Sequence, residues 1–410
     1  MSTLRLNVLY QGQRIGQIAE TDRGIYFQYD VLFLREKHEL SPLNLGLSRE
    51  VYGPFDWAGN TIPGLFVDSL PDSFGMDVIR QRFLQEGRPM PSQVGLLAYQ
   101  GSRTMGALSY EPSDGFADAQ EWVDISAAVD SARKIVEKEH AGVLNRSFVV
   151  SGGTAGGARP KLLVAMDSET RRIVTGTDHI PEGMRAWLLK LTHQRDSAGA
   201  IERAYSRMAE ASGIRVPQSR LVSDRQGEMH FAVERFDRAI DNPNLRIHTH
   251  TYAGLRQLDF RSTQNDYIEL LETTYALTQS QLAVEEQFAR MVFNVLAHNH
   301  DDHAKNFSFV YSHEQRTWSV SPAYDLMFTE NDLGGPWMTL GGKRVGLKIR
   351  DLVEVGQDFM IKKARIAEII DQTVEAVSNW ESWAAETEPA ENYRDFVRLR
   401  LKANLSEVTG

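Results

Sequence analysis

The 410-residue sequence contains no cysteine. Disulfides, thiolate metal sites and cysteine nucleophiles are therefore excluded, and we expect a reducing, cytoplasmic environment. The first residues alternate between polar and apolar types, so they predict neither a signal peptide nor a membrane-spanning helix. With a formal net charge of -10, the chain also lacks the basic balance that favours nucleic-acid binding through the overall field of a protein.

The remaining composition is that of an ordinary globular protein without internal repeats. A hydrophobic content of 42% over this length allows two domains or one large domain with lobes. Short apolar runs broken by glycines in residues 4–34 predict strands and hairpins. Apolar residues at helical spacing follow in residues 64–83, 121–138 and 282–297, so we predict a chain that combines sheets and helices.

The most informative segment is the polar turn at residues 298–306, which lies between two apolar segments. Asp301 and Asn306 are five positions apart. A protein-kinase catalytic loop uses this spacing to place an Asp that receives the substrate hydroxyl proton and an Asn that binds Mg²⁺. Asp325, downstream of a predicted hairpin, would be a second metal ligand, although an isolated Asp in this context is more simply a helix cap. A zinc hydrolase site is an alternative interpretation of the His and Asp cluster.

A glycine-rich segment, residues 151–161, separates two strand-like runs at 146–150 and 162–166. It is not a Walker loop, because Pro160 precedes Lys161 and a strand follows instead of a helix. A kinase-type glycine loop fits better, since small residues let backbone N–H groups approach phosphates. A flexible hairpin turn remains the alternative.

Two further segments fit a kinase amino-terminal lobe. Lys190 lies near the end of an apolar strand, where a kinase places its phosphate-binding lysine, and Glu202 in the following helix is the expected partner. An edge-strand lysine that reaches solvent is the alternative. Residues 231–238 are typical of a strand that leaves a core, and they correspond either to the hinge beside the adenine or to a strand with a salt-bridged end.

Together these segments resemble the HipA family of bacterial serine/threonine kinases, the toxin half of a type II toxin–antitoxin module. The resemblance covers most of the chain, from Gly64-Leu65-Phe66 to the segment 322–326, and its most specific parts are residues 301–308 and 322–326. The chain departs from the family at Arg159, where the family usually has Gln, and at Thr154, where it has a phosphorylatable Ser.

The resemblance implies an α+β, two-lobed protein-kinase-like fold with an α/β amino-terminal lobe and a mainly helical carboxy-terminal lobe. Its expected parts are a HipA amino-terminal subdomain at 1–110, a nucleotide-binding part with the glycine loop at 111–245 and a helical lobe at 246–410. Asp301 would be the catalytic base, with Asn306 and Asp325 as Mg²⁺ ligands, and Thr154 or Ser151 would be autophosphorylated. The implied ATP-binding residues are Thr154, Ala155, Gly156, Gly157, Ala158, Arg159, Lys161, Lys190, Glu234, Phe236, His303 and Lys305.

The implied function is that of an ATP- and Mg²⁺-dependent protein kinase toxin. Such a kinase would phosphorylate a translation-related protein, as family members do with an aminoacyl-tRNA synthetase, and would be held by a small HipB-like helix-turn-helix antitoxin. Operator DNA would be contacted only through that antitoxin. A small-molecule kinase and an ATP-binding co-repressor without turnover are the alternatives.

Overall fold

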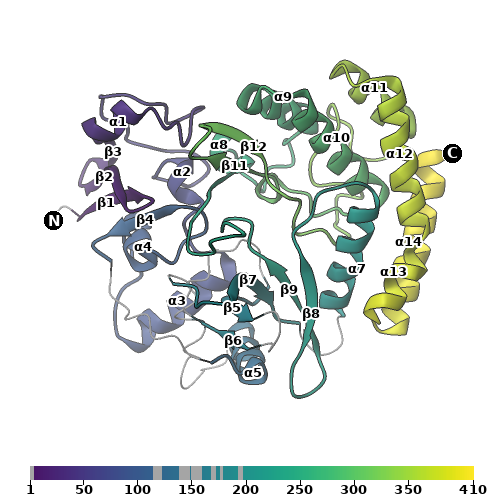
Figure 1. Cartoon of the computed structure of the whole chain (residues 1–410), viewed down its shortest axis with the longest axis horizontal. Helices are drawn as coiled ribbons and strands as arrows, with labels where there is room; N and C mark the ends of the chain where they lie inside the picture. Colours follow the sequence, from purple (N-terminus) through teal and green to yellow (C-terminus); the bar gives the residue numbers. More distant parts are fainter. Residues whose placement is uncertain are drawn as a thin grey trace.

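The protein is described by a computed structural model that covers residues 4–113, 122–137, 148, 159–167, 172–175, 179–192 and 197–410. Three antiparallel sheets and a large set of helices alternate along the chain, which confirms the predicted α+β class. Figure 1 shows the amino-terminal sheet at one end of the view, the helices α11 to α14 at the other, and the largest sheet between and below them. No helix among the described residues is long and apolar enough to cross a membrane.

The first sheet has the strand order β3-β2-β1-β4. Its first three strands are consecutive hairpins, and alternate side chains such as Leu6, Val8 and Tyr10 are buried, as the glycine-broken apolar pattern predicts. Its strands and the helices that follow them are β1 (Leu4–Tyr10), β2 (Gln13–Thr21), β3 (Gly24–Tyr29), α1 (Val31–Glu36), α2 (Gly64–Val67), α3 (Ser73–Gln85), α4 (Gln93–Gln100) and β4 (Leu108–Glu111).

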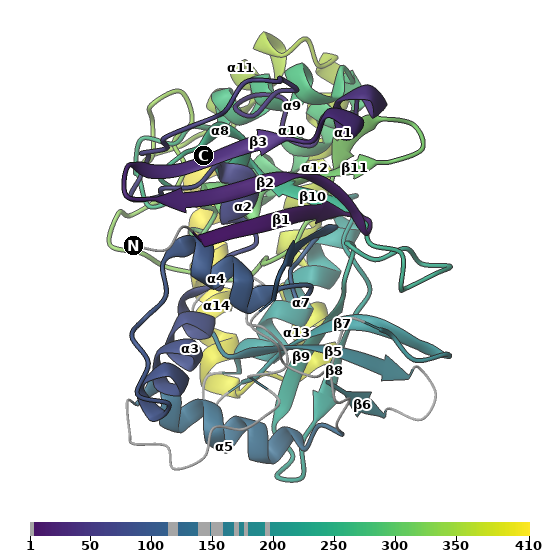
Figure 2. The ribbon, with the colours of Figure 1, turned by 90° about the vertical axis from the view of Figure 1, so that its left-hand side faces the viewer.

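The second sheet has the order β6-β5-β7-β9-β8, and helix α5 and helix α3 contribute to the core beneath it. Figure 2 shows this sheet below the amino-terminal strands. Residues 146–150 were expected to form a strand, but Phe148, the one described residue among them, is helical. The elements are α5 (Ile125–Val136), β5 (Lys161–Asp167), β6 (Ile173–Val174), β7 (Met184–Lys190), α7 (Ala198–Ala211), β8 (Ser219–Ser223) and β9 (Met229–Glu234).

The third sheet, β10-β11-β12, joins the helical part of the chain. The predicted helix at 282–297 is α10, whose amphipathic sequence packs against α9, α12 and α14. The elements are β10 (His248–Thr251), α8 (Tyr252–Arg256), α9 (Tyr267–Thr278), α10 (Gln281–Leu296), the 3₁₀ turn η1 (Ala304–Asn306), β11 (Ser308–Ser312), β12 (Thr317–Val320), α11 (Ile349–Asp358), α12 (Lys363–Ser378), α13 (Trp380–Thr387) and α14 (Glu391–Thr409).

The amino-terminal sheet shares one hydrophobic core with the helical lobe. At this junction α2 meets α8 so closely that a Cβ on Gly64 would lie 1.9 Å from the carbonyl oxygen of Gly254. Only glycine allows this approach, because any side chain would overlap the facing backbone. The motif Gly64-Leu65-Phe66 thus lies where the amino-terminal region packs against α8.

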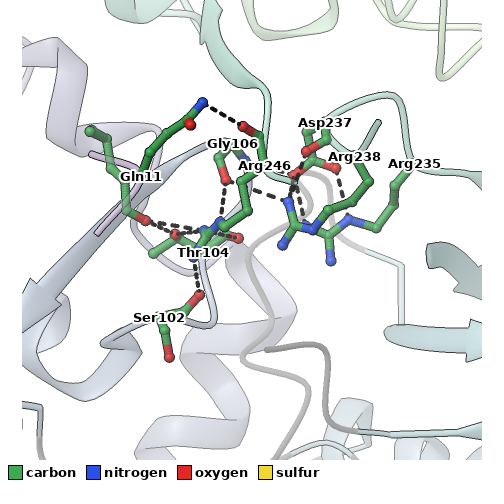
Figure 3. A network of polar contacts seen from close by, with 9 residues as sticks. Gln11, Ser102, Thr104, Gly106, Arg235, Asp237, Arg238 and Arg246 are labelled. Carbon is green, nitrogen blue, oxygen red and sulfur yellow. Dashed lines mark hydrogen bonds and ion pairs between the residues drawn. The ribbon is translucent and has the colours of Figure 1, made fainter. Parts of the chain in front are cut away.

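A buried ionic network ties the amino-terminal region to the segment that follows β9 (Figure 3). Asp237 lies between Arg235 and Arg238, at 2.7 and 2.8 Å, and accepts the Gly106 N–H at 2.7 Å. Arg246 donates to the Gly106 carbonyl at 2.8 Å. Burial alone would raise the pKa of Asp237, but the two flanking guanidinium groups hold it well below its usual range. The salt-bridged end expected of this strand is therefore present, and it fixes the strand end to a loop of the amino-terminal region.

Candidate active site

Lys190 is the last residue of β7, and its side chain is buried. Its ammonium group contacts the carboxylates of Glu202 in α7 and Asp325 after β12. The predicted pairing of Lys190 with Glu202 is confirmed. Because an isolated buried lysine would lose its charge, these two carboxylates are what keep it ionised.

Burial and neighbouring charges shift the pKa values of all three groups in this triad. Burial alone would lower the pKa of Lys190, but Asp325 and Glu202 outweigh burial and raise it. Burial raises the pKa of Glu202 despite the nearby Lys190, whereas at Asp325 the charges of Lys190 and Lys161 outweigh burial and lower the pKa. Asp325 therefore stays ionised at neutral pH and can accept a cation as a ligand.

Asp325 has a left-handed backbone conformation, with φ 57°. This region is uncommon for residues other than glycine, and Asp and Asn adopt it more readily than most. Asp325 is not a helix cap, since no helix begins at this position. The unusual backbone instead directs its carboxylate toward Lys190, as is common for strained residues at functional sites.

A pocket opens beside the triad. Lys190, Glu202 and Asp325 form its polar end. The pocket is small, with about 40 Å³ of free space, and its apolar walls come from the central sheet and from the segment around Asp325. Its apolar lining with a few convergent charged groups has the chemistry of a ligand site. The apolar lining residues are Leu188, Pro217, Phe231, Val233, Ala323 and Leu326.

The catalytic turn predicted at 298–306 follows α10 and ends in η1. Asp301 is an exposed residue, but its neighbours remove part of the water around its carboxyl group. This loss of hydration and the charge of Asp325 raise the pKa of Asp301, while His303 opposes the shift. Asn306 donates its Nδ2–H to the carbonyl oxygen of Asp301 at 2.7 Å. This bond closes the turn and leaves the Asn306 Oδ1 atom available as a ligand.

The residues present fit a Mg²⁺ ion. Asp325 offers a carboxylate of lowered pKa and Asn306 an amide oxygen, both of which are the hard oxygen donors that Mg²⁺ prefers. The ion would need only these two protein ligands, because Mg²⁺ usually completes its shell with water and substrate phosphates.

His303 and Lys305 of the same turn lie beside Phe260. The Lys305 ammonium is 4.3 Å from the centre of the Phe260 ring, and the two rings of His303 and Phe260 are 5.3 Å apart. Burial lowers the pKa of Lys305, although Asp68 opposes this effect. The buried His303 Nδ1 atom has no hydrogen-bond partner among the described residues. His303 is close enough to act on the pKa of Asp301, whereas the carboxylates that act on Lys305 are those of Asp68 and Asp72.

Of the glycine loop, only its last residues are described. Thr154, Ala155, Gly156, Gly157 and Ala158, together with Ser151, lie outside the described residues. Lys161, which directly faces Lys190 across β5 and β7, forms an ion pair with Asp72 at 3.0 Å. The positive charge of Arg159 opposes the rise in the pKa values of Asp301 and Glu202, so Arg159 is close to both groups.

Some of the residues predicted at the hinge line the pocket, and others have partners elsewhere. Phe231 and Val233 line the pocket, but the carboxylate of Glu234 is paired with Arg185 at 2.9 Å. Phe236 lies against the ring of Tyr324, at 5.6 Å between centroids, next to Asp325. Nucleotide contacts by Glu234 and Phe236 stay predictions, and they would come from the backbone in the case of Glu234.

The sequence of this chain matches known protein families. The sequence matches the HipA-like C-terminal domain over residues 153–380 and the HipA N-terminal domain over residues 6–111. The chain belongs to the HipA family. The resemblance inferred from the residues is thereby confirmed.

Two relatives and one solved structure illustrate the match. Y4dM and Y4mE of Sinorhizobium fredii, both named as candidate kinases, are each 27% identical; the first alignment covers 65% of this chain and 62% of that protein, the second 92% of each. The HipA toxin of Shewanella oneidensis MR-1, solved with HipB and operator DNA, superposes with a TM-score of 0.72 at 16% identity over 98% of this chain and 96% of that one. This likeness shows a shared HipA fold.

The zinc-type interpretation gains no support from the described residues, among which no three His, Asp or Glu side chains are gathered to hold a metal ion. The rings of His298 and His300 stack on each other at 3.8 Å instead. Sequence reasoning also missed Asp72, the partner of Lys161. Asp72 caps α3 through Gly75, so its sequence context indicated only a helix start.

Proposed function

We propose that the protein is an ATP- and Mg²⁺-dependent serine/threonine protein kinase, the toxin of a HipBA-like module. The observation that carries the proposal is the contact of Lys190 with both Glu202 and Asp325, beside the turn that holds Asp301 and Asn306. Membership of the HipA family and relatives named as kinases support it.

Each group has a distinct task in this proposal. Lys190 neutralises phosphate oxygens, and Asn306 and Asp325 hold Mg²⁺, while ATP supplies the transferable γ-phosphoryl group. Asp301 accepts the proton of the attacking hydroxyl, and its raised pKa brings it closer to the operating pH of a general base. Arg159 and Lys161 add positive charge at the end of the glycine loop, so the phosphates would meet cations from two strands.

The proposed antitoxin partner is supported by the structural neighbour, and the proposed substrate rests on the resemblance to the HipA family. The Shewanella HipA neighbour is a complex with HipB and operator DNA, which supports a HipB-like antitoxin as a partner. A helix-turn-helix fold of that antitoxin, and contact of this chain with operator DNA only through it, are part of the proposal. The proposed substrate is a translation-related protein, an aminoacyl-tRNA synthetase in the first instance. Autophosphorylation would use Thr154 or Ser151 of the glycine loop.

The test is phosphate transfer from labelled ATP in a bacterial extract, with Mg²⁺ and purified protein. We expect a labelled synthetase band with wild-type protein and none with Asp301→Gln. Asp332→Asn, which changes an exposed aspartate downstream of Asp325, is the matched control and should retain the label. Label only in small molecules would indicate a small-molecule kinase, and tight ATP binding without any transfer would indicate a co-repressor.

A further inference from the structure

A chain of hydrogen bonds starts at the backbone of Asp301. Its N–H donates to the Thr329 hydroxyl at 2.9 Å, and that hydroxyl donates to the Asn299 Oδ1 atom at 3.3 Å. The Asn299 Nδ2–H group then donates to Asn294 Oδ1 at 2.9 Å. The chain thus passes from the catalytic turn into α10.

The chain returns to the turn at the neighbouring residue. Asn294 donates its Nδ2–H to the Tyr267 hydroxyl at 3.0 Å, and Tyr267 donates to a carboxylate oxygen of Asp302. The other Asp302 oxygen accepts the backbone N–H of Trp337. Asn294, Tyr267 and Asp302 are all buried, so water does not compete for these bonds.

The two ends of this series of hydrogen bonds fix the donor-to-acceptor direction of every bond between them. A backbone N–H can only donate, and an ionised carboxylate can only accept. Every hydroxyl and amide between Asp301 and Asp302 therefore has one consistent orientation, with each donor pointing toward Asp302. Reversal of any single link would leave a buried donor facing a donor, which costs more than a hydrogen bond gains.

We propose that this one-way relay positions the catalytic Asp301, and that the buried carboxylate of Asp302 sets its direction. The inference rests on the proposed phosphoryl transfer and goes beyond it, because it assigns positioning roles to Tyr267, Asn294 and Thr329. The relay also joins the catalytic turn to the segment containing Trp337. Its members do not touch the nucleotide pocket, so their effect is on the placement of the base.

The relay requires Asp302 in its ionised form. A protonated Asp302 would present an O–H to Tyr267, whose oxygen already accepts from Asn294 and whose own proton would lose its acceptor. Tyr267 is the titratable side chain that hydrogen-bonds to Asp302, and burial raises the pKa of Tyr267 so strongly that it stays a donor. Burial raises the pKa of Asp302 to about 7, which brings this switch into the physiological range.

Four variants test the relay. Tyr267→Phe and Thr329→Val remove a hydroxyl with little change in shape, and Thr329→Ser restores the hydroxyl. Tyr252→Phe is the matched control, because Tyr252 is also fully buried but its hydroxyl has no hydrogen-bond partner among the described residues. We expect kcat to fall by about 10- to 100-fold in the first two variants, as for a misplaced catalytic group. The Kd for Mg·ATP should stay within about twofold, and Thr329→Ser and Tyr252→Phe should resemble wild type.

The pH profile separates positioning from simple structural support. In wild type, kcat should fall as the pH drops through about 7, where Asp302 becomes protonated. Asp302→Asn mimics the protonated form, so its kcat should be low at high pH and should lose this step, retaining only the titration of Asp301. If wild type is active and Tyr267→Phe and Thr329→Val have the same kcat as wild type, the relay is refuted but the proposed function is not. The same conclusion follows if the kcat of Asp302→Asn still falls as the pH drops through about 7. A wild type with no phosphoryl transfer at all would overturn the proposed function and the relay with it.

Discussion

Lys190→Met is the perturbation that bears most directly on the triad. It removes the ammonium that contacts Glu202 and Asp325, whose side chains are 3% and 27% exposed. Removing one partner of a buried ion pair costs about 3–5 kcal/mol, because the remaining charge stays buried. Since Asp325 retains some contact with water, we expect a loss of about 3 kcal/mol in the free energy of unfolding at pH 8.

The loss should depend on pH in a defined direction. Burial already raises the pKa of Glu202, and without Lys190 the pKa should rise further. A carboxyl group whose pKa is raised on folding contributes stability below its unfolded pKa and loses it as the pH rises through the folded pKa. The deficit of Lys190→Met relative to wild type should therefore be larger at pH 8 than at pH 5.

Urea unfolding followed by tryptophan fluorescence measures this at both pH values. Lys402→Met, which removes an exposed lysine of α14, is the control and should be close to wild type. Adding Glu202→Gln to Lys190→Met should recover most of the stability at pH 8 but not Mg·ATP binding. Equal stability of Lys190→Met and wild type at both pH values would refute the view that the two carboxylates depend on Lys190.

Three further outcomes follow from other parts of the molecule. Asp325→Ala should weaken Mg·ATP binding by at least tenfold in calorimetry, and unchanged affinity would remove it as a metal ligand. Gly64→Ala should lower the melting temperature by several degrees, because its Cβ would lie 1.9 Å from the Gly254 carbonyl oxygen, and an unchanged melting temperature would mean that the junction is not tightly packed. Prolonged incubation with Mg·ATP should place a phosphate on Thr154 or Ser151, visible by mass spectrometry; its like-charge repulsion should then lower ATP affinity, and an unmodified loop would exclude autophosphorylation.

The local sequence predicted the helices, strands and turns of the site better than the contacts between their side chains. The strand with Lys190, the acid in the next helix and the turn with Asp301 and Asn306 follow from spacing and periodicity, because these features are set by neighbours in the chain. The contact of Lys190 with Asp325 joins residues 135 positions apart, and no local pattern reports it.

In the amino-terminal region, too, contacts between distant parts of the sequence could not be predicted. Its strands were predictable from alternation, but their shared core with the helical lobe was not, because packing partners leave no local periodicity. Asp72 illustrates a double role. Its sequence context predicts a helix cap, which it is, while its second contact, to Lys161, depends on the way α3 docks against β5.

The sequence does not reveal the hydrogen-bond relay for a different reason. Tyr267 and Asn294 lie on the buried faces of α9 and α10, where their spacing indicates only helix packing. Asp302 lies next to Asp301 in the predicted catalytic turn, but its carboxylate faces the protein interior and not the pocket. Only the three-dimensional structure separates the exposed Asp301 from the buried neighbour.

The most direct test of the central claim is to measure Mg·ATP affinity and the rate of phosphate transfer on the same preparations of wild type and Asp301→Gln. Because a general base acts on the transition state, the account predicts nearly equal Kd values and a loss of transfer by at least about 100-fold in the variant. Transfer by Asp301→Gln at a rate close to that of wild type would contradict the assignment of Asp301 and, with it, the proposed kinase mechanism.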